Sequence, residues 1–85
     1  MIKLIAVELN DITQAVKIAG VCGKYLPDVS VDAHCGRYIV DAASILGMES
    51  LIGNFVSLET IGIDQDKIKA LKRELSGISG VLITC

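Results

Sequence analysis

Four segments of the chain are rich in β-branched residues or alternate between apolar and polar side chains, and they predict strands. The predicted strands are residues 2–8, 28–34, 37–40 and 55–61. The second has the strictest alternation, with Asp32 and His34 on its polar face. Such a pattern is typical of a strand with one face on a core and one face in water. A turn at Cys35-Gly36 is predicted to lead into the short return strand.

A first helix is predicted where the spacing changes after residue 11. Asn10 and Asp11 are both good N-cap residues, and Pro27 marks the end of the helix. Its predicted stripe consists of Ile12, Ala15, Val16, Ala19, Cys22, Gly23 and Leu26. Gly20 and Gly23 weaken a helix by about 1 kcal/mol each relative to Ala, and we expect them to allow close packing on a sheet.

Two further helices follow from the same periodicity. A short one is predicted at residues 44–52, and its apolar stripe consists of Ile45, Met48, Leu51 and Ile52. A longer one is predicted to begin at Asp64 or Asp66 and to bury Ile68, Leu71 and Leu75. Gly77 occupies the place of a C′ glycine after that helix.

The predicted order of elements is β-α-β-β-α-β-α, and the apolar residues 81–84 can pair as an additional edge strand. This order predicts an α+β fold, in which helices cover one face of an antiparallel sheet. The other face is expected to be partly solvated, because Ser57 and Glu59 lie opposite the apolar positions of their strand. Neither repeats nor linkers interrupt the chain, so residues 1–85 are predicted to form one domain.

Composition restricts the class of partner. Hydrophobic residues make up 52% of the chain and aromatic residues only 4%, so the core is expected to be aliphatic. The net charge is -2, which argues against nucleic acid as a partner. Four basic residues cluster in the last predicted helix: Lys67, Lys69, Lys72 and Arg73. Asp64, Asp66 and Glu74 lie on either side of this group, which is typical of a solvated helix face.

Localisation and redox state follow from what the sequence lacks. We expect no membrane span, because no stretch of about 18 apolar residues occurs. The first residues do not have the order of a signal peptide, so we expect a cytoplasmic protein. Cys22, Cys35 and Cys85 lack metal-type spacing and are expected to be free thiols, with Cys22 a small buried hydrophobe. His34-Cys35 lacks further zinc ligands and is assigned to an exposed turn; neither a metal nor a cofactor is expected.

Two segments resemble the HPr phosphocarriers of the sugar phosphotransferase system. Residues 40–51 (VDAASILGMESL) resemble the regulatory segment of HPr, where a serine opens a short helix in the pattern S-I-[ML]-G-x-x-S-L. Residues 24–31 (KYLPDVSV) are similar to the end of the first HPr helix and the start of the second strand. The order of elements and the length fit HPr over nearly the whole chain. The resemblance therefore implies the open-faced β-sandwich of HPr.

The chain departs from HPr at the carrier site. HPr carriers have Gly-[Ile/Leu]-His-[Ala/Thr]-Arg-Pro-Ala at the start of the first helix, whereas residues 9–15 here are LNDITQA. Asp11 stands at the histidine position, and the one histidine of the chain is His34. A carboxylate there caps the free helix amides and repels a phosphoryl group. The alternative is that Asp11 itself accepts a phosphoryl group as an acyl phosphate.

The resemblance also assigns candidate roles around the short helix. Ser44 matches the serine that HPr kinase phosphorylates, and it is equally well suited to cap the helix, a task for which Asp41 competes. Met48, Leu51 and Ile52 match the region where HPr docks partner proteins, or else they belong to the core.

We therefore expect an HPr-like module that is not an enzyme and does not carry phosphohistidine. It is expected to bind a protein partner, either of the phosphotransferase system or regulatory, or to be regulated through Ser44. A first alternative is a phosphotransfer component that uses another acceptor, such as Asp11 or His34. A second is a module of unrelated function that self-associates through a sheet edge, for which residues 81–84 are the candidate.

Overall fold

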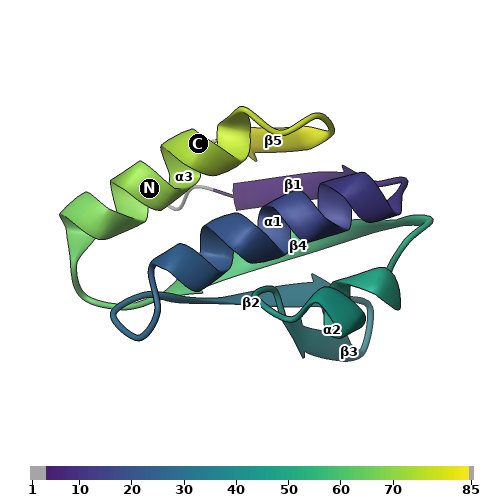
Figure 1. Ribbon diagram of the computed structural model, residues 1–85, viewed down its shortest axis with the longest axis horizontal. Coiled ribbons are helices and arrows are strands. Elements are labelled where there is room, and N and C mark those ends of the chain that lie inside the picture. The colour runs from purple at the N-terminus through teal and green to yellow at the C-terminus, as the bar shows by residue number, and fades with distance from the viewer. Residues whose placement is uncertain (1–3, 85) are drawn as a thin grey trace.

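Five strands form a single antiparallel sheet in the computed structural model, which describes residues 4–84. The strands are β1 (Leu4–Leu9), β2 (Ser30–Cys35), β3 (Tyr38–Asp41), β4 (Asn54–Ile61) and β5 (Val81–Thr84). Their order across the sheet is β3-β2-β4-β1-β5. Three helices cover one face, as Figure 1 shows: α1 (Ile12–Lys24), α2 (Ile45–Glu49) and α3 (Gln65–Ser76). The opposite face carries no helix in the described part of the chain.

The structure confirms the predicted fold class and the order of elements, including the additional strand. β5 pairs with β1, in the register Leu4↔Thr84 to Val7↔Val81. The observed strand boundaries differ from the predicted ones by up to two residues. The largest difference is at β2, which begins at Ser30, after a turn, instead of at residue 28. Residues 2 and 3 of the first predicted strand lie outside the described residues. None of the helices described is both long enough and apolar enough to cross a membrane.

An aliphatic core lies between the helices and the sheet. The register places apolar residues opposite one another on the covered face, as in Val7↔Val56 and Ala33↔Leu58. The largest fully buried side chains are Ile5, Leu9, Ile18, Met48, Leu71 and Leu75. Phe55 is 75% exposed. Within residues 4–84 no aromatic side chain belongs to the buried core, as the composition predicts, and the half-buried Tyr25 packs against it.

Helix α1 is rotated relative to its predicted orientation. Ala15, Ile18 and Cys22 face the core, whereas Ile12 and Val16 are exposed. The prediction was wrong in placing Ile12, Val16 and Leu26 on the buried stripe and in omitting Ile18. The helix ends at Lys24, before Leu26 and Pro27, and Leu26 is 45% exposed. A buried polar residue near the start of the helix, Gln14, supports the observed orientation through hydrogen bonds to β1 and to the turn before β5.

The glycines of α1 do not have the predicted role. Gly20 and Gly23 are exposed, and a β-carbon at either position would meet no atom within 4 Å. The prediction that they allow close packing on the sheet was therefore wrong. They lie on the face of α1 that is turned to solvent.

Helix α3 begins at an N-cap, as predicted, but it does not end as predicted. Asp64 caps α3 by accepting a hydrogen bond from the Lys67 amide at 3.1 Å, and the predicted burial of Ile68, Leu71 and Leu75 is confirmed. Gly77 has φ −80°, so the predicted left-handed C′ glycine was wrong. The chain makes another turn after α3, and the left-handed residue is Gly80, with φ +86°.

Candidate functional site

The start of α1 is closed by a capping box. The Asp11 carboxylate accepts a hydrogen bond from the Gln14 amide at 2.9 Å. The Gln14 side-chain oxygen Oε1 in turn accepts from the amides of Asn10 at 2.6 Å and Asp11 at 3.1 Å. The structure therefore confirms Asp11 as the N-cap of α1. Three backbone donors at this end of the helix have partners within the chain.

Gln14 joins three parts of the fold. Its side-chain nitrogen Nε2 donates to the carbonyl oxygens of Glu8 at 2.9 Å and Ser79 at 2.7 Å. The carboxamide thereby links β1, α1 and the turn between α3 and β5. Gln14 is only 7% exposed, and its hydrogen bonds hold the start of α1 against β1 and the turn. This role was not predicted, although the spacing of Asp11 and Gln14 is that of a capping box.

A shallow hollow of about 160 Å³ lies beside this capping box. It is lined by Asn10, Asp11, Thr13, Gln14, Lys17, Ile78 and Ser79. Lys17 is the one basic residue among these lining residues. An anion in the hollow would meet the Asp11 carboxylate and would find the amides of Asn10, Asp11 and Gln14 already bonded. This end of α1 is therefore a poor place for a phosphoryl group.

Ser44 caps α2, as predicted for its structural role. Its hydroxyl oxygen accepts a hydrogen bond from the Gly47 amide at 3.2 Å. Asp41 does not compete for this position, because its carboxylate accepts from the Ala43 amide at 2.9 Å, in the preceding turn. Ser44 is half-buried.

Cys22 lies in the core, as predicted, with 1% of its surface exposed. Burial raises the pKa of its thiol to about 12, and the negative charge of Asp41 contributes in the same direction. The thiolate is therefore scarce at neutral pH, and Cys22 is not a candidate nucleophile. Cys35 is half-buried and free. Cys85 lies outside the described residues.

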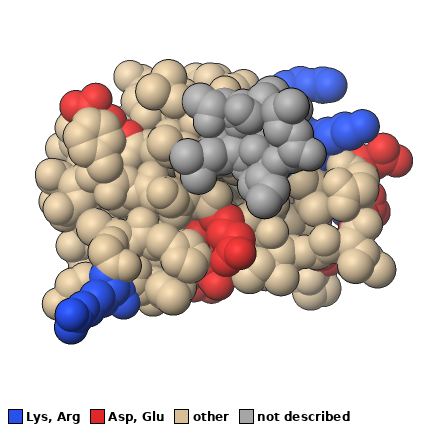
Figure 2. Space-filling view, turned by 180° about the vertical axis from the view of Figure 1, so that it is seen from behind, with Lys and Arg blue, Asp and Glu red and all other residues tan. Residues whose placement is uncertain are grey.

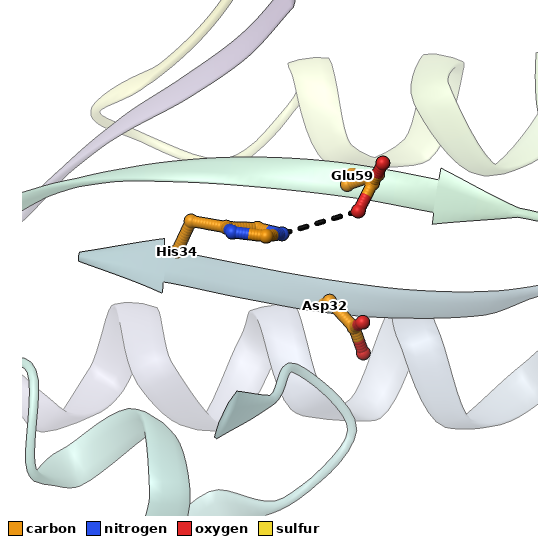
Figure 3. A group of neighbouring side chains, drawn as sticks. All are labelled: Asp32, His34 and Glu59. Atoms are coloured by element: carbon orange, nitrogen blue, oxygen red, sulfur yellow. Dashed lines mark hydrogen bonds and ion pairs between the residues drawn. The ribbon is translucent and has the colours of Figure 1, made fainter. Parts of the chain in front are cut away.

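A polar group gathers on the open face of the sheet, opposite the helices (Figure 3). Asp32 and His34 come from β2 and Glu59 comes from β4; His34 Nε2 lies 3.1 Å from Glu59 Oε1. The prediction that His34 belongs to an exposed turn was wrong, because β2 continues through Cys35. The chain turns at Gly36-Arg37, where Gly36 takes φ +59°.

The chain is similar to a crystal structure of HPr-C-His from Thermoanaerobacter tengcongensis, with a TM-score of 0.65 and 25% sequence identity. The similarity covers 91% of this chain and 93% of that one. The chain has an HPr-like fold. No protein-family model matches it, and no curated protein matches it.

Two of the predicted partner-binding residues lie inside the HPr-like fold. Met48 is fully buried and Leu51 is 4% exposed, whereas Ile52 is half-buried. The helix α2 ends at Glu49, so Leu51 and Ile52 belong to the turn that follows it. The apolar side chains that α2 presents to solvent are Ile45, at 46% exposed, and Leu46, at 78%. Any partner that docks on α2 meets these two residues first.

Proposed function

We propose that this protein is an HPr-like module of the sugar phosphotransferase system that binds a protein partner in the cytoplasm and does not carry phosphohistidine. The observation that carries the proposal is the closed start of α1. There the Asp11 carboxylate accepts from the Gln14 amide and places a negative charge where a phosphoryl group would bind, and the Gln14 carboxamide bonds the amides of Asn10 and Asp11.

The position of the histidine supports the same conclusion. A phosphohistidine carrier needs an imidazole as nucleophile, with positive charge around the phosphoryl group. His34 is on the open face of the sheet, whereas α1 covers the other face (Figures 1 and 3). Thr13 stands where the resemblance to HPr places an arginine, and it supplies no charge. His34 and the start of α1 therefore do not form one site.

An apolar surface on two neighbouring helices is our candidate for contact with a protein partner. We name Ile12 and Val16 of α1 with Ile45 and Leu46 of α2 the α1–α2 surface. Each of these side chains is at least 43% exposed. Ser44 begins α2, beside Ile45, so a phosphate on Ser44 would add roughly two negative charges next to this surface. Phosphorylation of Ser44 would then change the affinity for the partner.

Incubation with phosphoenolpyruvate and purified enzyme I tests the first part of the proposal. We expect no phosphorylated product under conditions in which an authentic HPr is fully phosphorylated. An acid-labile phosphate on His34, or a hydroxylamine-labile phosphate on Asp11, would overturn the proposal and support a phosphotransfer component.

Incubation with purified HPr kinase and ATP tests the second part. We expect phosphate on the wild type and on Ser50→Ala, and none on Ser44→Ala. We expect Leu46→Ser to lower the kcat/KM of the kinase on the order of tenfold, because an exposed apolar contact is lost. The matched control is Ile63→Ser, since Ile63 is 96% exposed and lies outside the α1–α2 surface. Equal loss in both variants, or labelling of Ser44→Ala, would contradict the assignment.

A further inference from the structure

We propose that Asp32, His34 and Glu59 form a binding site for a divalent transition-metal ion on the open face of the sheet, with Zn²⁺ as the best match. The proposal is independent of the function proposed above, because the site lies on the opposite face of the sheet from α1.

The sheet itself brings the three side chains together. Asp32 and His34 are two residues apart in β2, so they point to the same face. The β2–β4 register pairs Asp32 with Glu59 and His34 with Ser57, which places Glu59 across from Asp32 and diagonal to His34. Both strands are interior to the sheet, since β3 and β1 flank them. The backbone positions of the three residues are therefore fixed by hydrogen bonding on both sides.

The distances between the ligand atoms suit a small cation after a modest adjustment. One ligand atom of each residue lies within 4.8 Å of those of the other two. Zinc binds nitrogen and oxygen ligands at about 2.0–2.2 Å, which puts tetrahedral ligands roughly 3.4 Å apart. Glu59 is exposed, and Asp32 and His34 are half-buried. Their side chains are free to rotate closer by the required distance without moving the strands.

The donor set selects the kind of metal. An imidazole nitrogen favours zinc and its transition-metal neighbours, whereas Mg²⁺ and Ca²⁺ prefer oxygen ligands alone. Three protein ligands leave one position for water, which reaches this face freely. Two carboxylates with a neutral imidazole also carry the charge that a divalent cation neutralises. Asp41, which pairs with Asp32 across the β2–β3 register, adds to the negative potential.

The local hydrogen bonds leave this charge largely uncompensated. His34 bonds Glu59, but within residues 4–84 the Asp32 carboxylate has neither a hydrogen bond nor an ion pair with another side chain. Figure 2 shows this side of the molecule, with an acidic group near its middle and both acidic and basic side chains toward its edges. An exposed His–Glu pair contributes about 0–1 kcal/mol, so stability alone gives little reason for the arrangement. A bound cation accounts for all three residues.

The test uses tag-free, reduced protein labelled with ¹⁵N and titrated with ZnCl₂. His34 is the one histidine of the chain, so its imidazole nitrogen signals are unambiguous. We expect a stoichiometric shift of the His34 Nε2 signal, and 1:1 binding by calorimetry. MgCl₂ at the same concentration is expected to leave the signal in place. Absence of a shift with zinc would overturn the proposal.

Variants separate this site from other sources of zinc binding. We expect His34→Gln, Asp32→Asn and Glu59→Gln each to weaken zinc affinity about tenfold or more. The matched control is Glu8→Gln, since Glu8 is exposed on β1 and lies on the same face of the sheet. A variant with both Cys35→Ser and Cys85→Ser is expected to bind as the wild type does. Equal weakening by Glu8→Gln, or loss of binding with the two thiols, would contradict the site.

Discussion

The Gln14 side chain lies directly against Gly80, at the point where a β-carbon on Gly80 would be. The same β-carbon would stand 2.8 Å from the carbonyl oxygen of Glu8. The glycine thus allows the turn before β5 to approach the carboxamide that closes the start of α1. The capping of α1 and the docking of the C-terminal strand therefore depend on each other.

Replacing Gln14 removes four partly buried hydrogen bonds to backbone groups of Glu8, Asn10, Asp11 and Ser79. We expect Gln14→Leu to lower the free energy of unfolding by about 2–4 kcal/mol, as measured by urea denaturation. The matched control is Gln65→Leu, since Gln65 is exposed at the start of α3. A loss no larger than that of the control would show that the Gln14 bonds do not stabilise the fold.

Substitution of glycine by alanine should have opposite effects at two positions. Gly80→Ala forces a β-carbon into Gln14 at φ +86°, and we expect it to cost about 1–3 kcal/mol. Gly20→Ala adds a methyl group at an open helical position, and we expect it to stabilise by about 0.5–1 kcal/mol. Thermal unfolding of the two variants checks both signs. If Gly80→Ala is neutral, the close approach of the turn to Gln14 is not as described.

Burial of Cys22 makes stability depend on alkaline pH. The unfolded thiol ionises near its ordinary pKa of 9.0, whereas the folded thiol stays neutral up to about 12. Above pH 9 the unfolded state binds fewer protons than the folded state, so stability falls by about 1.4 kcal/mol per pH unit from this group. We expect Cys22→Ala to have a flatter decline between pH 9 and 10.5. Parallel curves for the variant and the wild type would contradict the raised pKa.

The cap at Ser44 can be separated from any regulatory role. Ser44→Ala removes the acceptor of the Gly47 amide and should cost about 1 kcal/mol, whereas Ser44→Asp keeps an acceptor and should remain close to the wild type. Hydrogen exchange of the Gly47 amide reports the local effect, which should be faster exchange in Ser44→Ala alone. Unchanged exchange in that variant would indicate that the hydroxyl does not cap α2.

The sequence predicts the elements well because each has a local signal. The alternation in β2 and β4 identifies the solvated residues, and the N-caps Asp11, Ser44 and Asp64 mark the helix starts. The rotation of α1 is less well defined by local signals, because Ile12 and Val16 stand at helical spacing as well as the buried Ala15, Ile18 and Cys22. Hydrogen bonds from Gln14 to Glu8 and Ser79 support the observed face, and Ser79 is 65 positions away in the sequence.

The contact among Asp32, His34 and Glu59 on the open face could not be predicted from the sequence either. Alternation places Asp32 and His34 on the polar face of one strand and Glu59 on the polar face of another strand. That these faces coincide follows from the pairing of β2 with β4, and single-strand patterns carry no information on which strands pair. The buried positions of Met48 and Leu51 likewise depend on how α2 packs, which periodicity in a five-residue helix does not fix.

The pairing of β1 with β5 also affects how fast the chain can fold. Leu4 pairs with Thr84, and the neighbouring β1–β4 ladder joins Leu9 to Asn54. These contacts require closure of long loops before the sheet gains hydrogen bonds, and domains dominated by such pairings fold in milliseconds to seconds. A circular permutant that joins the ends of β5 and β1 by a short linker would turn the most distant pairing into a hairpin. We expect such a permutant to refold faster than the natural order of the chain.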